Sequence, residues 1–290
     1  MRSKEFIKEA KGKKIVLLNK KIINQIHSEC GDFLSNAKSP LFRGFKREIK
    51  GLQKVPIRTN RVPADSSSID TAAFNYLFEL NTGVPYIRNI TAFATTEAHV
   101  ADQYGRIHMI FPLNGTKYYR ATGIVDVYGE FESNIGDFED TASDYIRAIV
   151  KSDDEEDRLI AELEDIQDNV YATKGRVNKA GLHKIFGKHI KLWKMFIKQF
   201  QPIINKFYMY DGFHPELNKA NEEIGMFGVP FYYVFNIENI IDMASDLDYK
   251  IYINDKRIDT NGGDMDDMEL FVLHAIKNNH EIYAIKREWD

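Results

Sequence analysis

The sequence has 290 residues and a formal net charge of −4, with 43% hydrophobic and 28% charged residues. This length is enough for one large domain or two ordinary ones, and the composition is that of a globular protein with a real hydrophobic core. The single cysteine, Cys30, excludes an intrachain disulfide and a cysteine-built metal site, and it fits a reducing compartment. The small net charge gives no global reason to expect binding to nucleic acids or membranes.

The N-terminal segment 1–14 is rich in lysine but also contains Glu5 and Glu9, and it has no long apolar stretch. It therefore fits neither a signal peptide nor a membrane span. The sequence predicts a soluble, cytoplasmic protein.

The first third of the chain predicts helices that are separated by a short buried strand. Apolar residues recur there at helical spacing, while proline and glycine mark the ends of elements. The first expected elements are a short helix over 3–10, a run at Ile15–Leu18 that could be helix or strand, and a helix over Ile22–Leu34 that ends before Pro40. A strand at Leu41–Phe45 follows. A loop over 51–68, whose last residues can cap the next helix, leads to a helix at Ile69–Leu80 that is stopped by Asn81–Gly83.

The next stretch predicts strands that flank a short helix. The expected elements are a strand at Ile90–Thr95, a helix at Glu97–Tyr104, and strands at Arg106–Leu113 and Tyr118–Val127. The Asn114-Gly115 pair between the last two strands is a hairpin signal. We therefore expect these two strands to pair with each other.

Residues 128–212 are predicted to form a mostly helical insertion. The acidic run Asp153–Asp157 suits the start of a helix, where carboxylates interact favourably with the helix dipole. A second helix is marked by one apolar stripe from Leu182 to Phe207, with lysines 184, 188, 191, 194 and 198 beside it. A basic amphipathic helix can bind a membrane or an acidic partner. Packing on the core with a solvated lysine face explains the same pattern.

Strand character returns at Val229–Phe235, and the tail predicts a small ββαβ unit. Its expected elements are strands at Lys250–Ile253 and Arg257–Asp259 around a turn at Asn254-Asp255, a helix at Asp266–Lys277 and a strand at Glu281–Lys286. The predicted fold class is α+β. We expect a main domain at 1–245, which contains the helical insertion, and a C-terminal unit at 246–290.

The first candidate site residue is Arg43, in the strand Leu41-Phe42-Arg43-Gly44. An unpaired charge is costly in a buried strand, so this arginine needs an anionic partner. The guanidinium geometry suits a phosphate or pyrophosphate, and Gly44 leaves room for a ligand or another backbone. A structural arginine–carboxylate pair is an alternative explanation.

Two later segments offer hydroxyl groups and a carboxylate. The strand Phe93-Ala94-Thr95-Thr96 ends in two threonines, which can hydrogen-bond a ligand or cap the following helix. Glu223, with Glu222 beside it, precedes an apolar strand. A carboxylate there can accept a hydrogen bond from a ribose hydroxyl and stabilise an oxocarbenium-like centre, although an ordinary exposed carboxylate pair has the same sequence.

In their order, these segments resemble the arginine–serine–glutamate class of the ADP-ribosyltransferase superfamily. That class has an aromatic-Arg-Gly strand, then a Phe-x-Ser/Thr-Ser/Thr strand, then an acidic residue that opens a later strand. The spacing of Arg88, Tyr104 and Ile110-Phe111-Pro112 is similar to that of phage-encoded members. The resemblance covers about residues 22–127 and 213–236, and it implies an ADP-ribosyltransferase-like split β-sandwich core.

The resemblance also implies a set of site residues. The catalytic residues would be Arg43, Thr95 and Glu223. NAD, as a substrate, would be bound by Arg43, Gly44, Phe93, Thr95, Thr96 and Tyr104. In this family the arginine binds the NAD phosphates and the nicotinamide-side ribose, the hydroxyl strand holds the site together, and the glutamate polarises the ribose 2′-hydroxyl.

Two positions depart from the family pattern. Thr95 stands where serine is usual, and Asn221 stands where the acidic motif has Glu or Gln, which leaves the class of acceptor residue open. Glu222 is an alternative to Glu223 as the catalytic acid. The segment Glu130-Phe131-Glu132 fits the acidic spacing better, but no convincing apolar strand follows it, and strand context is what supports such a motif.

The resemblance thus implies a glycosyltransferase that moves ADP-ribose from NAD to a macromolecular acceptor. For a phage-encoded chain the acceptor would be a host protein or nucleic acid, and the protein would act in the host cytoplasm or in the virion. The histidines His183 and His189, six residues apart, suit a two-ligand metal site poorly, so no metal is expected. The alternatives are an NAD glycohydrolase and a non-catalytic phage virion or interaction protein that keeps the fold. No membrane partner is expected, and the sequence leaves the oligomeric state open.

Overall fold

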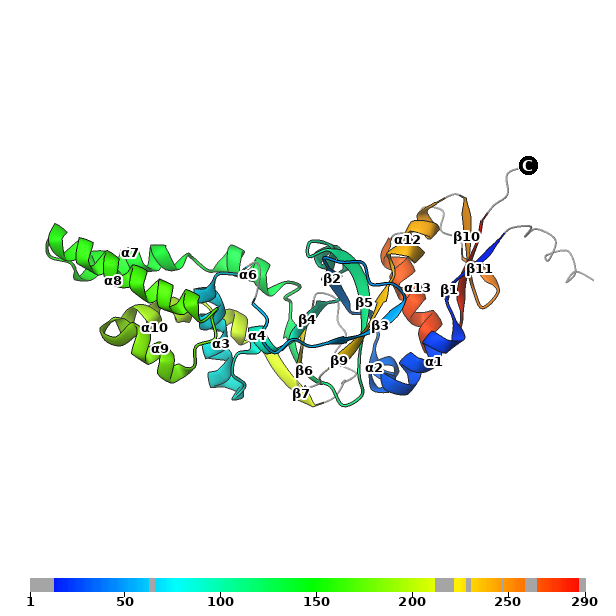
Figure 1. The fold of residues 1–290 in the computed structure, drawn as a ribbon, viewed down its shortest axis with the longest axis horizontal. Coiled ribbons are helices and arrows are strands. Elements are labelled where there is room, and N and C mark those ends of the chain that lie inside the picture. Colours follow the sequence, from blue (N-terminus) through cyan, green and yellow to red (C-terminus); the bar gives the residue numbers. More distant parts are fainter. Residues whose placement is uncertain are drawn as a thin grey trace, which may run out of the picture.

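Two antiparallel sheets and two groups of helices form an elongated molecule (Figure 1). The computed structural model describes residues 13–62, 66–211, 222–227, 231–246, 248–258 and 265–286. The strands are β1 (Lys14–Leu18), β2 (Phe42–Phe45), β3 (Leu52–Pro56), β4 (Ala92–Thr95), β5 (Arg106–Pro112), β6 (Lys117–Thr122), β7 (Phe207–Asp211), β8 (Glu222–Phe227), β9 (Phe231–Asn236), β10 (Tyr249–Ile253), β11 (Lys256–Ile258) and β12 (Ile282–Lys286). One sheet has the order β1-β12-β10-β11 and the other the order β3-β9-β5-β2-β4-β8-β6-β7, which confirms an α+β fold.

The helices cover the two ends of the large sheet. They are α1 (Lys20–Glu29), α2 (Gly31–Asn36), α3 (Ser68–Thr82), α4 (Ile87–Ile90), α5 (Ala98–Asp102), α6 (Val127–Asn134), α7 (Phe138–Ile149), α8 (Asp153–Ala172), α9 (Lys179–Phe186), the 3₁₀ helix η1 (Gly187–His189), α10 (Ile190–Lys198), α11 (Gln201–Ile204), α12 (Glu238–Ser245) and α13 (Met265–Lys277). Helices α3 and α6 to α11 form a lobe at one end of the molecule, on the left in Figure 1. Helices α1, α12 and α13 lie near the small sheet at the other end.

The large sheet is divided at its middle. Strands β2 and β4 share a single register pair, Phe42↔Thr95. On its other side, each of these two strands pairs over four positions, β2 with β5 and β4 with β8. The sheet therefore consists of two halves, β3-β9-β5-β2 and β4-β8-β6-β7, which part from each other on leaving the Phe42↔Thr95 pair.

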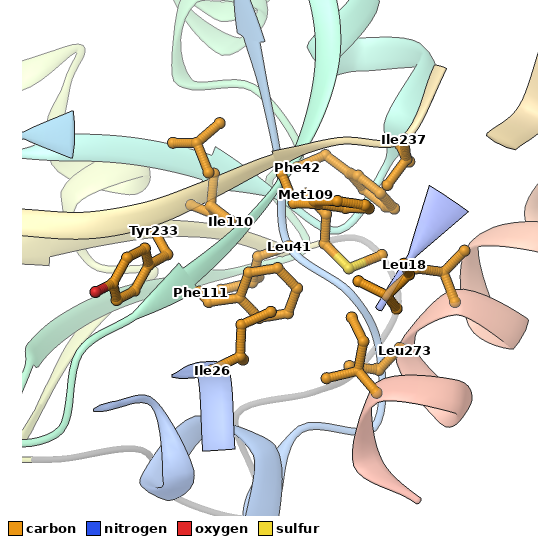
Figure 2. Packing of buried hydrophobic residues seen from close by; sticks show 14 of the residues in the cluster. Leu18, Ile26, Leu41, Phe42, Met109, Ile110, Phe111, Tyr233, Ile237 and Leu273 are labelled. Carbon is orange, nitrogen blue, oxygen red and sulfur yellow. The ribbon is translucent and has the colours of Figure 1, made fainter. Parts of the chain in front are cut away.

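One hydrophobic core joins the small sheet to the large sheet, mainly to its first half, and it also takes in Ala92, Ala94, Tyr118 and Ile224 of the second half. Figure 2 shows Leu18 of β1 and Leu273 of α13 packed toward Phe42 and Met109 of the large sheet. All four side chains are buried, and burying a side chain of this size contributes roughly 1.5–3 kcal/mol. Because β1 pairs with β12, the small sheet is built from both ends of the chain. The ββαβ segment therefore shares its sheet and core with the N-terminal segment.

A second core fills the helical lobe and extends to the second half of the large sheet. Its aromatic side chains meet mostly edge to face, an arrangement that adds stability beyond area burial. The ring centroids of Phe78 on α3 and Tyr119 on β6 lie 4.6 Å apart, and those of Phe74 and Phe207 lie 5.5 Å apart. These contacts attach α3, and with it the lobe, to β6 and β7.

Several local predictions are confirmed. Helix α3 begins after Ser67, whose hydroxyl accepts a hydrogen bond from the Asp70 amide at 3.1 Å, and it ends at Gly83, which has a φ of 75°. The ambiguous run Ile15–Leu18 lies in strand β1. The tail has the expected strand, turn, strand, helix and strand in order. The predicted helix over 3–10 lies outside the described residues.

Two predicted long helices are wrong. The helix over Ile22–Leu34 is interrupted at Cys30, where φ is −127° and α1 gives way to α2. The apolar stripe from Leu182 to Phe207 belongs to four helical segments and a strand, because Gly187 leaves the helical conformation with a φ of 44° and a ψ of −118° and Phe207 opens β7. The stripe looked continuous because the successive helices all bury their apolar side in one core.

The predicted hairpin between 106–113 and 118–127 is also wrong. Asn114 and Gly115 do form a turn, but β2, β4 and β8 lie between β5 and β6 in the sheet. The turn binds α2 instead, since the Asp32 amide donates to the Asn114 side chain at 3.0 Å and the Gly115 amide donates to the Asp32 carboxylate at 3.1 Å. These bonds hold the turn against α2. Strand β5 pairs with β2 and β9 instead, and β6 pairs with β7 and β8.

Other element boundaries differ from the prediction. The second strand of the expected hairpin ends at Thr122, and Val127 opens α6. Strand β4 begins at Ala92, after the short helix α4. Strand β3 lies in the predicted 51–68 loop, and its Pro56 suits an edge strand. Among the residues that the structure describes, no helix has the length and apolar character needed to cross a membrane.

Candidate functional site

A pocket lies between β2 and β4, where the two halves of the large sheet part. It contains about 600 Å³ of atom-free space, counting the solvent at its mouth. The described residues that line it are Phe42, Arg43, Gly44, Arg61, Arg88, Phe93, Ala94, Thr95, Val100, Ala101, Tyr104, Val125, Asp126 and Tyr128. Five of the six residues predicted to bind NAD are among them, namely Arg43, Gly44, Phe93, Thr95 and Tyr104.

Arg43 is held across the split in the sheet. Its Nη1 donates a hydrogen bond of 2.5 Å to the carbonyl oxygen of Phe93, and its guanidinium carbon lies 5.8 Å from the centre of the Phe45 ring. No carboxylate of the described residues pairs with Arg43, so the alternative of an arginine–carboxylate pair is not seen among them. A guanidinium has five N–H donors. The carbonyl takes one, and the half-buried side chain presents the others at the pocket wall.

Two further arginines flank the ring of Phe93. The guanidinium carbon of Arg88 lies 5.3 Å from the ring centre and that of Arg61 lies 6.0 Å from it. Arg88 is 5% exposed, and its guanidinium also lies over the rings of Phe74 and Phe131 at 5.8 and 5.4 Å. Such cation–π contacts hold a buried guanidinium in place. The described wall therefore carries three guanidinium groups and one carboxylate, that of Asp126.

Tyr104 is fixed by the carboxylate of Asp126. The Tyr104 hydroxyl donates to Asp126 Oδ2 at 2.7 Å. The same carboxylate caps α6, because it accepts hydrogen bonds from the amides of Tyr128 at 3.0 Å and Gly129 at 3.2 Å. The phenol ring is thus held at the pocket wall by the N-terminus of a helix in the neighbouring lobe.

Gly44 makes room for another backbone, which is one of the two roles predicted for it. A Cβ atom at this position would collide with the carbonyl oxygen of Ala101 and would lie 2.8 Å from Tyr104 Cβ. The absence of a side chain therefore lets α5 and the turn after it pack directly on β2. That close packing brings Tyr104 to the pocket.

The two threonines have different positions. Thr95 is 5% exposed and lines the pocket, and its hydroxyl accepts a hydrogen bond from the Glu97 amide at 3.1 Å just before α5. This bond closes a turn ahead of α5, whose N-cap residue is Glu97, and it is not a helix cap. Thr96 is half-buried and is not among the described residues that line the pocket.

The backbone of Glu223 lies next to Thr95. Thr95 pairs with Phe42 of β2 on one side and with Glu223 of β8 on the other. Positions 43, 95 and 223 therefore belong to three neighbouring strands, β2, β4 and β8. The side chains of Glu222 and Glu223, and the whole of Asn221, lie outside the described residues.

The competing acidic segment is helical. Glu130 and Glu132 lie on α6, where Glu130 pairs with Lys206 at 3.5 Å and Glu132 accepts a hydrogen bond of 2.6 Å from Tyr128. Glu132 faces a second hollow, next to the pocket, that is also lined by Asp70, Asp137 and Asp140. Burial raises the pKa of Asp70 there, while its hydrogen bonds with Ser67 oppose the rise.

Three charged residues of the wall, Asp126, Arg88 and Arg61, were not predicted as site residues. Asp126 precedes α6 as a capping residue should, and recognising that helix would have identified it. Arg88 was singled out only because its spacing is similar to that in phage-encoded family members. Arg61 lies in a segment that has no local signal for a site residue. Within the described part of the chain, no group of three or more His, Cys, Asp or Glu residues is placed to hold a metal ion. Comparison with family models, curated proteins and solved structures finds no match to this chain.

Proposed function

We propose that this protein is an NAD-dependent ADP-ribosyltransferase whose site is the pocket between β2 and β4. The observation that carries the proposal is the convergence of Arg43, Phe93 and Tyr104 in one pocket with two further arginines. A dinucleotide needs cations for its two phosphates and apolar or aromatic walls for its rings. The described wall offers both kinds of group.

The topology of the sheet supports the same proposal. The resemblance implies a split β-sandwich in which the strands of the arginine, the hydroxyl residue and the glutamate lie together. Strands β2, β4 and β8 are neighbours here, and the sheet is divided between the first two. The competing segment around Glu130 lies on a helix, which favours Glu223 as the acidic residue.

The reaction breaks the N-glycosidic bond of NAD and joins C1′ of the freed ribose to an acceptor. Nicotinamide leaves with the bonding electron pair, a nucleophile of the acceptor attacks C1′ from the opposite face, and the acceptor loses a proton. Because nicotinamide is already an activated leaving group in NAD, the protein contributes positioning and charge stabilisation. No metal takes part in these steps.

Each site residue has a distinct role in this proposal. Arg43 binds the phosphates through the donors that its bond to Phe93 leaves available. Tyr104, fixed by Asp126, forms a rigid wall beside the bound cofactor. Glu223 accepts a hydrogen bond from the 2′-hydroxyl and stabilises the positive charge that develops at C1′. The acceptor is a macromolecule, and for a phage-encoded chain it is a host protein or nucleic acid.

The test is transfer of label from NAD, labelled in its adenylate half, to the macromolecules of a bacterial lysate. We expect wild-type protein to label an acceptor and to release nicotinamide. Glu223→Gln should lower transfer by about 100-fold or more, since it removes the charge that stabilises the transition state. Arg43→Lys should weaken NAD binding because lysine lacks the guanidinium fork. Glu132→Gln, on α6, is the matched control and should transfer like wild type.

Other outcomes would change the assignment. Full transfer by Glu223→Gln would remove Glu223 from the mechanism. Free ADP-ribose without labelled macromolecules would identify an NAD glycohydrolase. No consumption of NAD by wild type would favour the non-catalytic virion or interaction protein, for which the bond between the Thr95 hydroxyl and the Glu97 amide is the supporting observation.

A further inference from the structure

Charge is strongly segregated within the helical lobe. Between residues 130 and 168 the chain has fifteen Asp and Glu residues and three Lys and Arg residues. Between residues 169 and 210 it has nine Lys and Arg residues and no Asp or Glu. The acidic part forms α7 and α8, and the basic part forms α9, η1 and α10. The lobe therefore has a negative and a positive side, although the net charge of the whole chain is small.

The basic side displays its lysines to solvent. What we call the lysine face consists of Lys179, Lys184, Lys188, Lys191, Lys194 and Lys198, and all six are exposed. Lys188 pairs with Glu162 of α8 at 2.8 Å. The other five make no ion pair with any described residue. On α10, lysines 191, 194 and 198 are three and four residues apart, so they form one stripe along the helix.

The apolar side of the same helices is not available to a partner. Trp193 and Phe196 of α10 and Leu182 of α9 are fully buried in the core of the lobe. A helix that lies in a membrane surface needs its apolar side free for the lipid. Met195, at 45% exposure, is the one large apolar side chain that the described lysine helices expose. A folded protein partner would need an apolar centre to its interface, and this surface has none.

We propose that the lysine face binds the phosphate backbone of duplex nucleic acid without reading its sequence. Lysine is a compact point charge that contacts phosphates, and it lacks the planar fork with which arginine recognises bases. The α10 stripe covers about 10 Å at 1.5 Å per residue. That length matches about three phosphates of one strand, which are spaced 3.4 Å along the duplex axis.

The acidic side of the lobe restricts how the duplex can approach. Helix α8 begins with four consecutive acidic residues, Asp153 to Glu156, and they repel a polyanion. The duplex is therefore guided to the lysine face and away from the start of α8. This inference uses no residue of the pocket between β2 and β4 and does not rest on the proposed transferase activity.

The test measures binding of the full chain to a fluorescein-labelled DNA duplex of mixed sequence, by anisotropy between roughly 50 and 200 mM salt. We expect binding that weakens steeply with salt and is the same for an unrelated duplex. The triple variant Lys191→Gln, Lys194→Gln and Lys198→Gln should bind roughly tenfold or more weakly at the lowest salt. Its slope of log K against log salt should be shallower by about 2.7, since each phosphate contact contributes about 0.9.

The matched control removes three exposed lysines from elsewhere, with Lys21→Gln, Lys50→Gln and Lys256→Gln. It has the same net charge as the α10 variant and should bind almost as wild type does. Circular dichroism and thermal unfolding check that both variants are folded. The proposal is overturned if wild type does not bind the duplex, if both variants lose affinity equally, or if polyglutamate or phosphatidylserine vesicles bind as tightly as the duplex.

Discussion

Replacing Gly44 with alanine should destabilise the protein by about 2 kcal/mol. The added Cβ would meet the Ala101 carbonyl oxygen and would lie 2.8 Å from Tyr104 Cβ, where ordinary contacts begin at 3.4 Å. The segment 101–104 would have to move by about 0.6 Å or more, and overpacking of this kind costs about 1–3 kcal/mol. We expect a cost near the upper end of this range because the colliding oxygen belongs to the backbone of Ala101. Alanine offsets about 0.4–1 kcal/mol of that by restricting the unfolded chain.

The assay is thermal unfolding of Gly44→Ala beside Gly225→Ala. Gly225 is also a strand glycine, but a Cβ there would lie 3.4 Å from Phe93 Cε1, which is an ordinary contact. The unfolded-state effect is common to both variants and cancels in the comparison. Gly44→Ala should lower Tm by roughly 6–12 °C relative to Gly225→Ala, because the full overpacking cost of about 3 kcal/mol remains and corresponds to about 2–4 °C per kcal/mol. Equal Tm values would refute the close packing of α5 on β2.

Two further predictions concern buried contacts near the site and the core. Burial, and then the charge of Glu29, raises the pKa of Cys30 to about 12. This thiol should resist thiol reagents at about pH 8 in the folded protein and react once urea unfolds it. The stability that comes from burying the neutral thiol is complete below its unfolded pKa of 9.0 and is lost as the pH rises toward 12. If the thiol reacts at the same rate in the folded and the unfolded protein, its burial is contradicted. Asp126→Ala should cost about 1–2 kcal/mol in urea unfolding, more than Tyr104→Phe, because it removes the cap of α6 as well as the hydrogen bond to Tyr104. A greater loss in Tyr104→Phe would contradict this order.

The sequence predicts local structure well where a local cause sets it. Helix α3 has a capping hydroxyl at Ser67 and a left-handed stop at Gly83, and both signals lie within the segment itself. The tail is similar, since the turn at Asn254 and Asp255 is encoded by residues that tolerate a positive φ. The break at Cys30 has only a weak local signal, the glycine at position 31, because the apolar helical spacing continues through it. The packing of α1 and α2 on the same core decides it.

Strand pairing is the part that the sequence could not provide. A two-residue turn at Asn114-Gly115 predicts a hairpin from local geometry alone. The actual partners of β5 and β6 come from segments up to about 130 residues away, as the pairing of His108 with Asn236 shows. The same limit applies to the candidate site. Arg43 and Tyr104 could be identified from their own segments, whereas the place of Arg61 in the wall depends on how β4 is packed.

The division of the sheet explains why a ligand pocket forms next to Arg43. Beyond the single pair Phe42↔Thr95, strands β2 and β4 make no further register pairs, so the backbone groups that face the gap need other partners. The Phe93 carbonyl finds one in the Arg43 guanidinium. This bond closes the gap on one side and fixes the arginine in a single orientation, so a bound phosphate does not have to order it. The same contact therefore stabilises the split sheet and, under the proposed function, holds Arg43 in place to bind a phosphate, which is why Arg43 is the best-supported residue of the proposed site.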